Sequence, residues 1–191
     1  MSSRSVAVLL PVKAFHQAKL RLAPALDEAA RAALAVEMAT KVVDAAAPLP
    51  VAVVCDDDAV AAWAATVGAT VIWRPGRGLN AAVTDGVEQL AADGFERVIV
   101  AHADLPHAQD LAWVADFAGV TLVPDRHDDG TNVVSVPTDA GFRFAYGPAS
   151  FARHVAEAGR LDLPLRVERS PRLGWDVDLP ADLVTPDWLA S

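Results

Sequence analysis

Hydrophobic and polar residues follow one another along this chain in blocks that predict strands and helices in turn. Short continuous apolar runs are typical of strands that are buried on both faces. Four such runs occur in the first half of the chain, at 6–12, 51–54, 70–73 and 97–101. Between them, apolar residues three or four positions apart predict helices with one buried face, at 27–47, 56–67 and 79–92. This alternation favours right-handed βαβ units and a largely parallel sheet.

The second half of the chain has a less regular pattern. It predicts a short helix at 111–117, a helix from Gly147 to about Ala158, one helical turn in the C-terminal tail, and strands at 120–123, 133–136, 142–146, 165–168 and 175–178. We therefore expect an α/β protein with a mixed, mainly parallel sheet. A length of 191 residues fits a single domain over 1–191.

Composition and charge exclude several classes of protein. The net charge of −9 argues against a nucleic-acid partner or an anionic membrane surface. Cys55 is the one cysteine, so neither an internal disulfide nor a cysteine-rich zinc site can form. No apolar run reaches the length needed to span a membrane, and no secretory leader is recognisable. We therefore expect a cytoplasmic protein.

Three aspartates are candidates for a metal site. Asp104 follows the apolar run at 97–101, and ligands of open α/β sheets bind at the carboxyl ends of strands. On an extended strand, Asp176 and Asp178 would point to the same face, where two like charges favour a shared cation. With Asp104 they form a hard oxygen set suited to Mg²⁺. The alternatives are that Asp104 caps a helix and that the pair lies on an exposed edge strand.

Basic residues gather in the loop after the first predicted strand. Lys13, Lys19 and Arg21 lie where many nucleotide-binding folds hold phosphates, although neither a P-loop nor a G-x-G-x-x-G sequence is present. Gly78 would let a ligand approach the start of the helix at 79–92, and Asn80 could pair with a base edge. A solvated loop and a simple turn are the alternatives for these two features.

A second anion site is predicted at the helix that begins near Gly147. The main-chain N–H groups of Ala149 and Ser150 would be free there, and the segment 130–132 could add further donors. The histidines His102 and His154 are expected to pack or to form hydrogen bonds rather than to catalyse.

Seven short motifs, taken in order, resemble one family. They are P-V-K at 11–13, A-K-L-R-L at 18–22, G-L-N at 78–80, H-A-D-L-P at 102–106, G-T-N at 130–132, Y-G-P-A-S-F at 146–151 and W-D-V-D-L-P at 175–180. The family is that of the phosphoenolpyruvate or 2-phospho-L-lactate guanylyltransferases of deazaflavin coenzyme F-420 biosynthesis. The resemblance implies a three-layer fold of the nucleotide-diphospho-sugar transferase type. It also implies transfer of GMP from GTP to a three-carbon phospho-acid, with release of pyrophosphate.

The resemblance also assigns roles to residues. Asp104, Asp176 and Asp178 match Mg²⁺-binding aspartates, and Thr131, Gly147 and Ser150 match positions that hold the phospho-acid through main-chain N–H groups. The resemblance implies that Lys13, Lys19 and Arg21 surround the triphosphate, with Lys13 and Lys19 also catalytic, and that Gly78 and Asn80 lie near the guanine. Leu20 departs from the expected pattern, in which a small polar residue stands between Lys19 and Arg21.

Phosphoenolpyruvate is the expected acceptor, because the alanine-rich composition suggests a bacterium with a GC-rich genome. The alternatives are 2-phospho-L-lactate or another three-carbon phospho-acid as acceptor, a nucleotidyltransferase for a sugar phosphate or molybdopterin, and a nucleotide-binding domain without turnover. The absence of a G-G-x-x-x-R run after the first strand counts against the sugar-phosphate alternative. In the pathway that the resemblance implies, the product passes to the next transferase.

Overall fold

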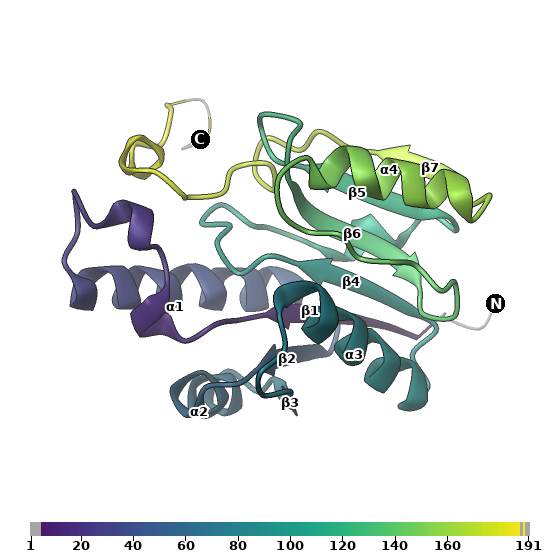
Figure 1. Ribbon diagram of the computed structural model, residues 1–191, viewed down its shortest axis with the longest axis horizontal. Helices are drawn as coiled ribbons and strands as arrows, with labels where there is room; N and C mark the ends of the chain where they lie inside the picture. The colour runs from purple at the N-terminus through teal and green to yellow at the C-terminus, as the bar shows by residue number, and fades with distance from the viewer. Residues whose placement is uncertain (1–4, 188, 190–191) are drawn as a thin grey trace.

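The computed structural model describes residues 5–187 and 189, and one seven-stranded sheet runs through them (Figure 1). The strand order is β3-β2-β1-β4-β6-β5-β7. In chain order the strands are β1 (Val6–Pro11), β2 (Val51–Cys55), β3 (Thr70–Trp73), β4 (Arg97–Ala101), β5 (Val120–Pro124), β6 (Thr131–Pro137) and β7 (Leu165–Val167). Only β6 runs against its neighbours, β4 and β5, so the predicted mixed, mainly parallel sheet is confirmed.

Helices cover both faces of the sheet. The four α-helices are α1 (Glu28–Ala46), α2 (Asp58–Thr66), α3 (Leu79–Ala92) and α4 (Ser150–Arg160). Val8 and Leu10 of β1 face the core that α1 and α2 complete, whereas Ala7 and Leu9 face the core beneath α3 and α4. Because every position of such a strand is buried, its sequence is apolar throughout. The three layers that the resemblance implied are therefore present.

Helix boundaries lie within a few residues of the predicted ones in the first half of the chain. Asp27 caps α1 by accepting the N–H of Ala30 at 2.8 Å, and Asp57 caps α2 through the N–H groups of Ala59 and Val60. The helix predicted at 111–117 is a single 3-10 turn, η3 (Ala112–Ala115). Three further 3-10 turns are η1 (Phe15–Gln17), η2 (Leu20–Leu22) and η4 (Pro180–Leu183), the last being the helical turn predicted in the C-terminal tail.

The strand predicted at 142–146 is wrong. These residues are extended, and Phe142, Phe144 and Tyr146 are buried as the alternation predicts, but the segment joins no sheet. Side chains of α3 and α4 take the place of a neighbouring strand. The N–H groups of Arg143, Ala145 and Tyr146 donate to side chains on these two helices, namely those of Glu157, His154 and Asn80.

Two other predicted elements also differ. Helix α4 begins at Ser150 rather than near Gly147, because Ala149 precedes it in the left-handed conformation, at φ 56°. The strand predicted at 175–178 is also absent, and its backbone groups bond to other parts of the chain, as described below. Within the described residues, no helix is long and apolar enough to cross a membrane.

Candidate active site at the carboxyl ends of strands β1 and β4

Strand β4 delivers Asp104 to the edge of the sheet at which the neighbouring parallel strand β1 also ends. The Asp104 carboxylate accepts a hydrogen bond through Oδ2 from Lys19 Nζ at 2.5 Å, and its buried Oδ1 has no hydrogen-bond partner among the residues that the structure describes. The next helical turn, η3, begins only at Ala112, so the alternative in which Asp104 caps a helix is wrong. A buried carboxylate oxygen without a donor is costly, and such atoms in native proteins call for a functional explanation.

The structure brings Asp104 and Asp178 together at Lys19, and Asp176 lies within electrostatic range of both aspartates. Lys19 Nζ lies 3.0 Å from Asp178 Oδ1, so one ammonium group bridges Asp104 and Asp178. The N–H of Val177, between the other two aspartates, donates to the main-chain oxygen of Asp104 at 3.3 Å. Arg21 adds a more exposed cation, 3.8 Å from the second carboxylate oxygen of Asp178. In Figure 1 this is where the yellow C-terminal segment approaches the purple loop after β1.

Mutual charge sets the pKa values in this cluster. Burial and the nearby charges of Asp104 and Asp178 raise the pKa of Asp176. Burial alone would raise the pKa of Asp104, but the charge and hydrogen bond of Lys19, with a smaller contribution from His102, hold it below its usual range. Burial would lower the pKa of Lys19, but Asp104 and Asp178 raise it above its usual range. At neutral pH Lys19 and Asp104 therefore form an ion pair.

The chemistry of this cluster fits a hard divalent cation. Among residues 5–187 and 189, no three acidic, histidine or cysteine side chains are placed to hold a metal ion together, and Asp176 pairs with Arg126 instead. The Lys19 ammonium nevertheless occupies the space where Asp104 and Asp178 approach each other, so two carboxylates already share a cation. Carboxylate oxygens are the ligands that Mg²⁺ prefers, and the unpartnered Oδ1 of Asp104 leaves one of them available.

Thr131 begins β6 at this same edge of the sheet, where the antiparallel strand starts beside the end of β4. Its hydroxyl lies 3.0 Å from His154 Nδ1, and His154 Nε2 accepts the N–H of Ala145 at 2.9 Å. Burial lowers the pKa of His154 to about 4, so the ring is neutral at pH 7 and Nδ1 donates to Thr131. The prediction that His154 forms hydrogen bonds is confirmed.

The predicted set of free N–H groups near α4 is wrong. The N–H of Ala149 donates to Asp129 Oδ1 at 3.2 Å, and that of Ser150 donates to the Gly147 oxygen at 3.0 Å. The N–H of Gly130 donates to Asp125 Oδ2 at 2.8 Å. Asp125 and Asp129 thus act as internal caps, which the sequence does not distinguish from other acidic loop residues. Binding of a phospho-acid at Thr131, Gly147 and Ser150 stays a prediction.

The remaining predicted residues lie further from the aspartates or serve the fold. Lys13 is exposed directly after β1, and Gly78 is the exposed N-cap residue of α3. Asn80 is committed to the backbone of Tyr146: it accepts the N–H at 2.7 Å and donates to the carbonyl oxygen at 3.3 Å. This pairing gives Asn80 a structural role, and its contact with a guanine stays a prediction.

Arg126 and Asp182 contact the segment 174–179, which carries Asp176 and Asp178 and is called the aspartate segment below. Sequence reasoning missed both residues. Arg126 lies in the loop between β5 and β6, and its guanidinium bonds to both Asp176 and Asp182. A signal for Asp182 existed, because it stands at the third position of η4, where an acidic side chain caps a helix start. No local spacing pointed to Arg126.

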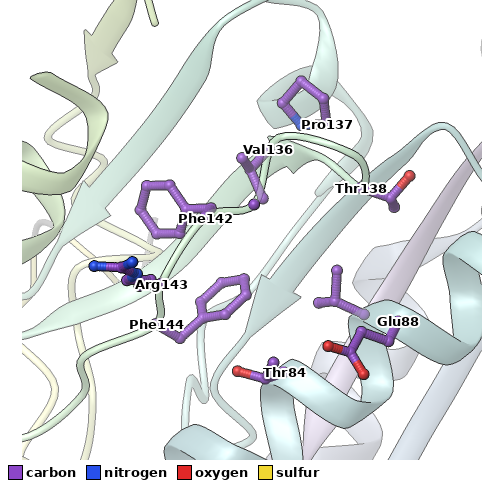
Figure 2. A pocket seen from close by; sticks show the side chains of 10 residues that line it. Thr84, Glu88, Val136, Pro137, Thr138, Phe142, Arg143 and Phe144 are labelled. Carbon is purple, nitrogen blue, oxygen red and sulfur yellow. The ribbon is translucent and has the colours of Figure 1, made fainter. Parts of the chain in front are cut away.

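A pocket of about 280 Å³ lies away from this cluster. Figure 2 shows Thr84 and Glu88 of α3 on one side, with Phe142, Arg143 and Phe144 of the extended segment on the other. Its lining includes Val136 and Pro137, which pair with the beginning of β4, whereas Asp104 follows the end of that strand. The pocket is therefore not part of the candidate active site.

Comparison with known proteins agrees with this architecture. A crystal structure of a candidate nucleotide-diphospho-sugar transferase from Desulfovibrio desulfuricans G20 superposes with a TM-score of 0.77 over 95% of this chain and 85% of the other, at 17% identity. That similarity establishes the fold alone.

Sequence relatives are more informative. A phosphoenolpyruvate guanylyltransferase from Rubrobacter xylanophilus is 35% identical over 94% of this chain and 92% of its own length. One from Sphaerobacter thermophilus is 34% identical, over 92% and 89% of the two chains. The family model described as "Guanylyl transferase CofC like" matches residues 6–185. The chain therefore belongs to the CofC-like guanylyl transferase family.

Proposed function

We propose that this chain transfers GMP from GTP to phosphoenolpyruvate and releases pyrophosphate, as a step in coenzyme F-420 biosynthesis. The observation that carries the proposal is the Lys19 ammonium shared by Asp104 and Asp178 at the carboxyl edge of the sheet, with Asp176 within electrostatic range of both aspartates. The names of the relatives, at 34–35% identity over nearly the whole chain, support the choice of acceptor.

The reaction explains why such a site needs carboxylates rather than a general base. The nucleophile is a phosphate monoester oxygen whose second pKa is about 6, so it is already largely deprotonated at pH 7. It forms a bond to the α-phosphorus of GTP, while the bond to the bridging oxygen breaks and pyrophosphate leaves with the electron pair. The barrier is electrostatic, because an anion must approach a triphosphate.

The side chains divide this work between them. Asp104, Asp176 and Asp178 would hold Mg²⁺, which neutralises phosphate charge and favours in-line displacement. Lys19 donates hydrogen bonds from a buried ammonium, and Lys13 and Arg21 add positive charge on the same loop for the triphosphate. Thr131, Gly147 and Ser150 would hold the acceptor next to the start of β6.

The product contains a phosphoric anhydride that joins GMP to the acceptor. Such an anhydride is an activated group donor, and we expect a following transferase to accept it. GTP and a three-carbon phospho-acid are thus the proposed partners of this chain.

The function is tested by incubating the protein with Mg²⁺, GTP and one phospho-acid at a time, and measuring pyrophosphate. The acceptors are phosphoenolpyruvate, 2-phospho-L-lactate and glucose 1-phosphate, with ATP in place of GTP as a control for the base. We expect the highest kcat/KM with GTP and phosphoenolpyruvate. Faster turnover with 2-phospho-L-lactate would identify that compound, rather than phosphoenolpyruvate, as the acceptor. Absence of pyrophosphate with every acceptor would overturn the proposal.

A further inference from the structure

Asp176 and Asp178 lie in a segment, 174–179, that belongs to neither a helix nor a strand. A regular ladder of backbone hydrogen bonds therefore does not fix the direction of their side chains. Metal ligands must be held within a few tenths of an ångström of their working positions. Other contacts have to supply that rigidity here.

Arg126 supplies one set of these contacts. Its Nη1 donates to the main-chain oxygen of Asp176 at 2.8 Å and lies 3.4 Å from Oδ1 of the same residue. Its Nη2 donates to the carboxylate of Asp182. Its guanidinium carbon also lies 4.4 Å from the centre of the Trp175 ring. One planar group thus contacts two residues of the segment and Asp182 beyond it, which a lysine ammonium cannot do with the same geometry.

Asp182 supplies the other set. One oxygen accepts from Arg126, and the other accepts the N–H groups of Asp178 and Leu179 at 2.9 and 2.7 Å. The main-chain oxygen of Asp182 also accepts the indole N–H of Trp175 at 3.3 Å. Asp182 is buried, and both of its carboxylate oxygens are occupied, so it is committed to holding the segment rather than to binding a ligand.

The two side chains therefore hold the two aspartates by their backbones, Asp176 through Arg126 and Asp178 through Asp182. We infer that Arg126 and Asp182 are positioning residues that fix the carboxylates of Asp176 and Asp178 for metal binding. Since these carboxylates bind a metal only under the function proposed above, the positioning role rests on that function. Arg126 also lies on the loop that leads to Thr131, so the same contacts tie the loop beside the predicted acceptor site to the metal segment.

The chain offers a matched control. Arg169 forms an ion pair with Asp128, which is on the same loop as Arg126, with Nε 3.0 Å from Asp128 Oδ1. Both partners are exposed, Arg169 also lies over the ring of Phe151, and within the described residues the pair forms no side-chain hydrogen bond or ion pair with residues 174–182. Arg169→Met therefore removes an arginine and an ion pair from the same region and leaves the aspartate segment unchanged.

The test compares Arg126→Met, Arg126→Lys, Asp182→Asn and Arg169→Met with the unaltered protein. Mn²⁺ affinity is measured without substrates, from the electron paramagnetic resonance signal of the free ion, together with the thermal unfolding temperature. The Mg²⁺ concentration that gives half-maximal pyrophosphate release is measured in parallel. Loss of an outer contact to a metal ligand typically weakens metal binding by about tenfold to a hundredfold.

We expect Mn²⁺ affinity to fall by about tenfold to a hundredfold in Arg126→Met and Asp182→Asn, and by less in Arg126→Lys. In Arg169→Met we expect Mn²⁺ affinity to change by less than about twofold. High Mg²⁺ should restore much of the activity of Arg126→Met. If Arg126→Met does not fold, Arg126→Lys and Asp182→Asn decide the result. Mn²⁺ affinity within twofold of the unaltered protein in folded variants would overturn the positioning role and leave the proposed function standing. Absence of both Mn²⁺ binding and turnover in the unaltered protein would overturn both.

Discussion

The two halves of this protein hold their functional residues in different ways. From β1 to β4, the parallel strands pair with one another and the helices form their backbone hydrogen bonds internally, and Asp104 is placed by the strand that precedes it. In the segments 142–146 and 174–182, side chains take over that task. Local sequence can specify the first arrangement, whereas the second depends on partners that are far apart in the chain.

The largest effect is expected for Asp104, which strand β4 places in the candidate active site. Asp104→Asn keeps the shape of the side chain but removes the negative charge that pairs with Lys19 and that would bind a metal ion. We expect kcat/KM for pyrophosphate release to fall by at least about a hundredfold, with the fold retained. Asp116→Asn, on the exposed part of the same connection after β4, is the control. Near-full activity of Asp104→Asn would show that this carboxylate does not take part.

Lys19 joins the two halves, so its removal should weaken the whole fold. Lys19→Met leaves Asp104 and the partly exposed Asp178 without their shared cation. We expect a loss of roughly 3 kcal/mol in the free energy of unfolding by urea, as for a broken buried ion pair. Lys13→Met should cost less than about 0.5 kcal/mol, because Lys13 is exposed. Equal losses in the two variants would contradict the bridging role of Lys19.

A variant of His154 tests whether the stability of the second half of the protein, whose segments are held by side chains, depends on pH. Its pKa is about 4 in the folded protein and 6.5 when exposed, so the unfolded state binds more protons between these values. The stability that neutral His154 contributes is complete above pH 6.5 and is lost as the pH falls toward 4, by on the order of 3 kcal/mol. Urea unfolding at several pH values should show this loss, and His154→Gln should lack that part of it. An unchanged pH profile in the variant would exclude His154 as the cause.

The smallest effect is expected at Asn80, which holds the extended segment at Tyr146. Asn80→Ala should destabilise the protein by about 1–2 kcal/mol, although alanine is the better helix former. Glu88→Ala, on the exposed face of the same helix, should be neutral or slightly stabilising. A stabilised Asn80→Ala protein would mean that water replaces the amide without cost.

These comparisons explain how much the sequence could predict. The strand at 97–101 and the helices at 27–47 and 56–67 depend on neighbouring residues, and all three are confirmed to within two residues at each end. Asp104, Asp176 and Asp178 were predicted as a group; the structure joins Asp104 and Asp178 through Lys19 and leaves Asp176 paired with Arg126, so their shared metal site stays a prediction. The alternation at 142–146 correctly predicted an extended backbone and its buried face, but not that helices would replace its neighbouring strand. The pair Arg126 and Asp182 is separated by 56 positions, and no local pattern encodes such a pairing.

The reversed direction of β6 has a consequence for how this enzyme family can change. Because β6 runs against β4 and β5, the turn at 125–130 opens on the catalytic edge, and its exposed residues His127 and Asp128 can vary without disturbing a parallel ladder or the contacts of Arg126 to the aspartates. Under the proposed function, the donor side depends on the βα framework, whereas the acceptor side depends on this single turn and the start of α4. Acceptor choice could therefore diverge among relatives while the nucleotide half and Arg126 stay constant, which makes His127 and Asp128 a compact target for exchanging acceptor preference.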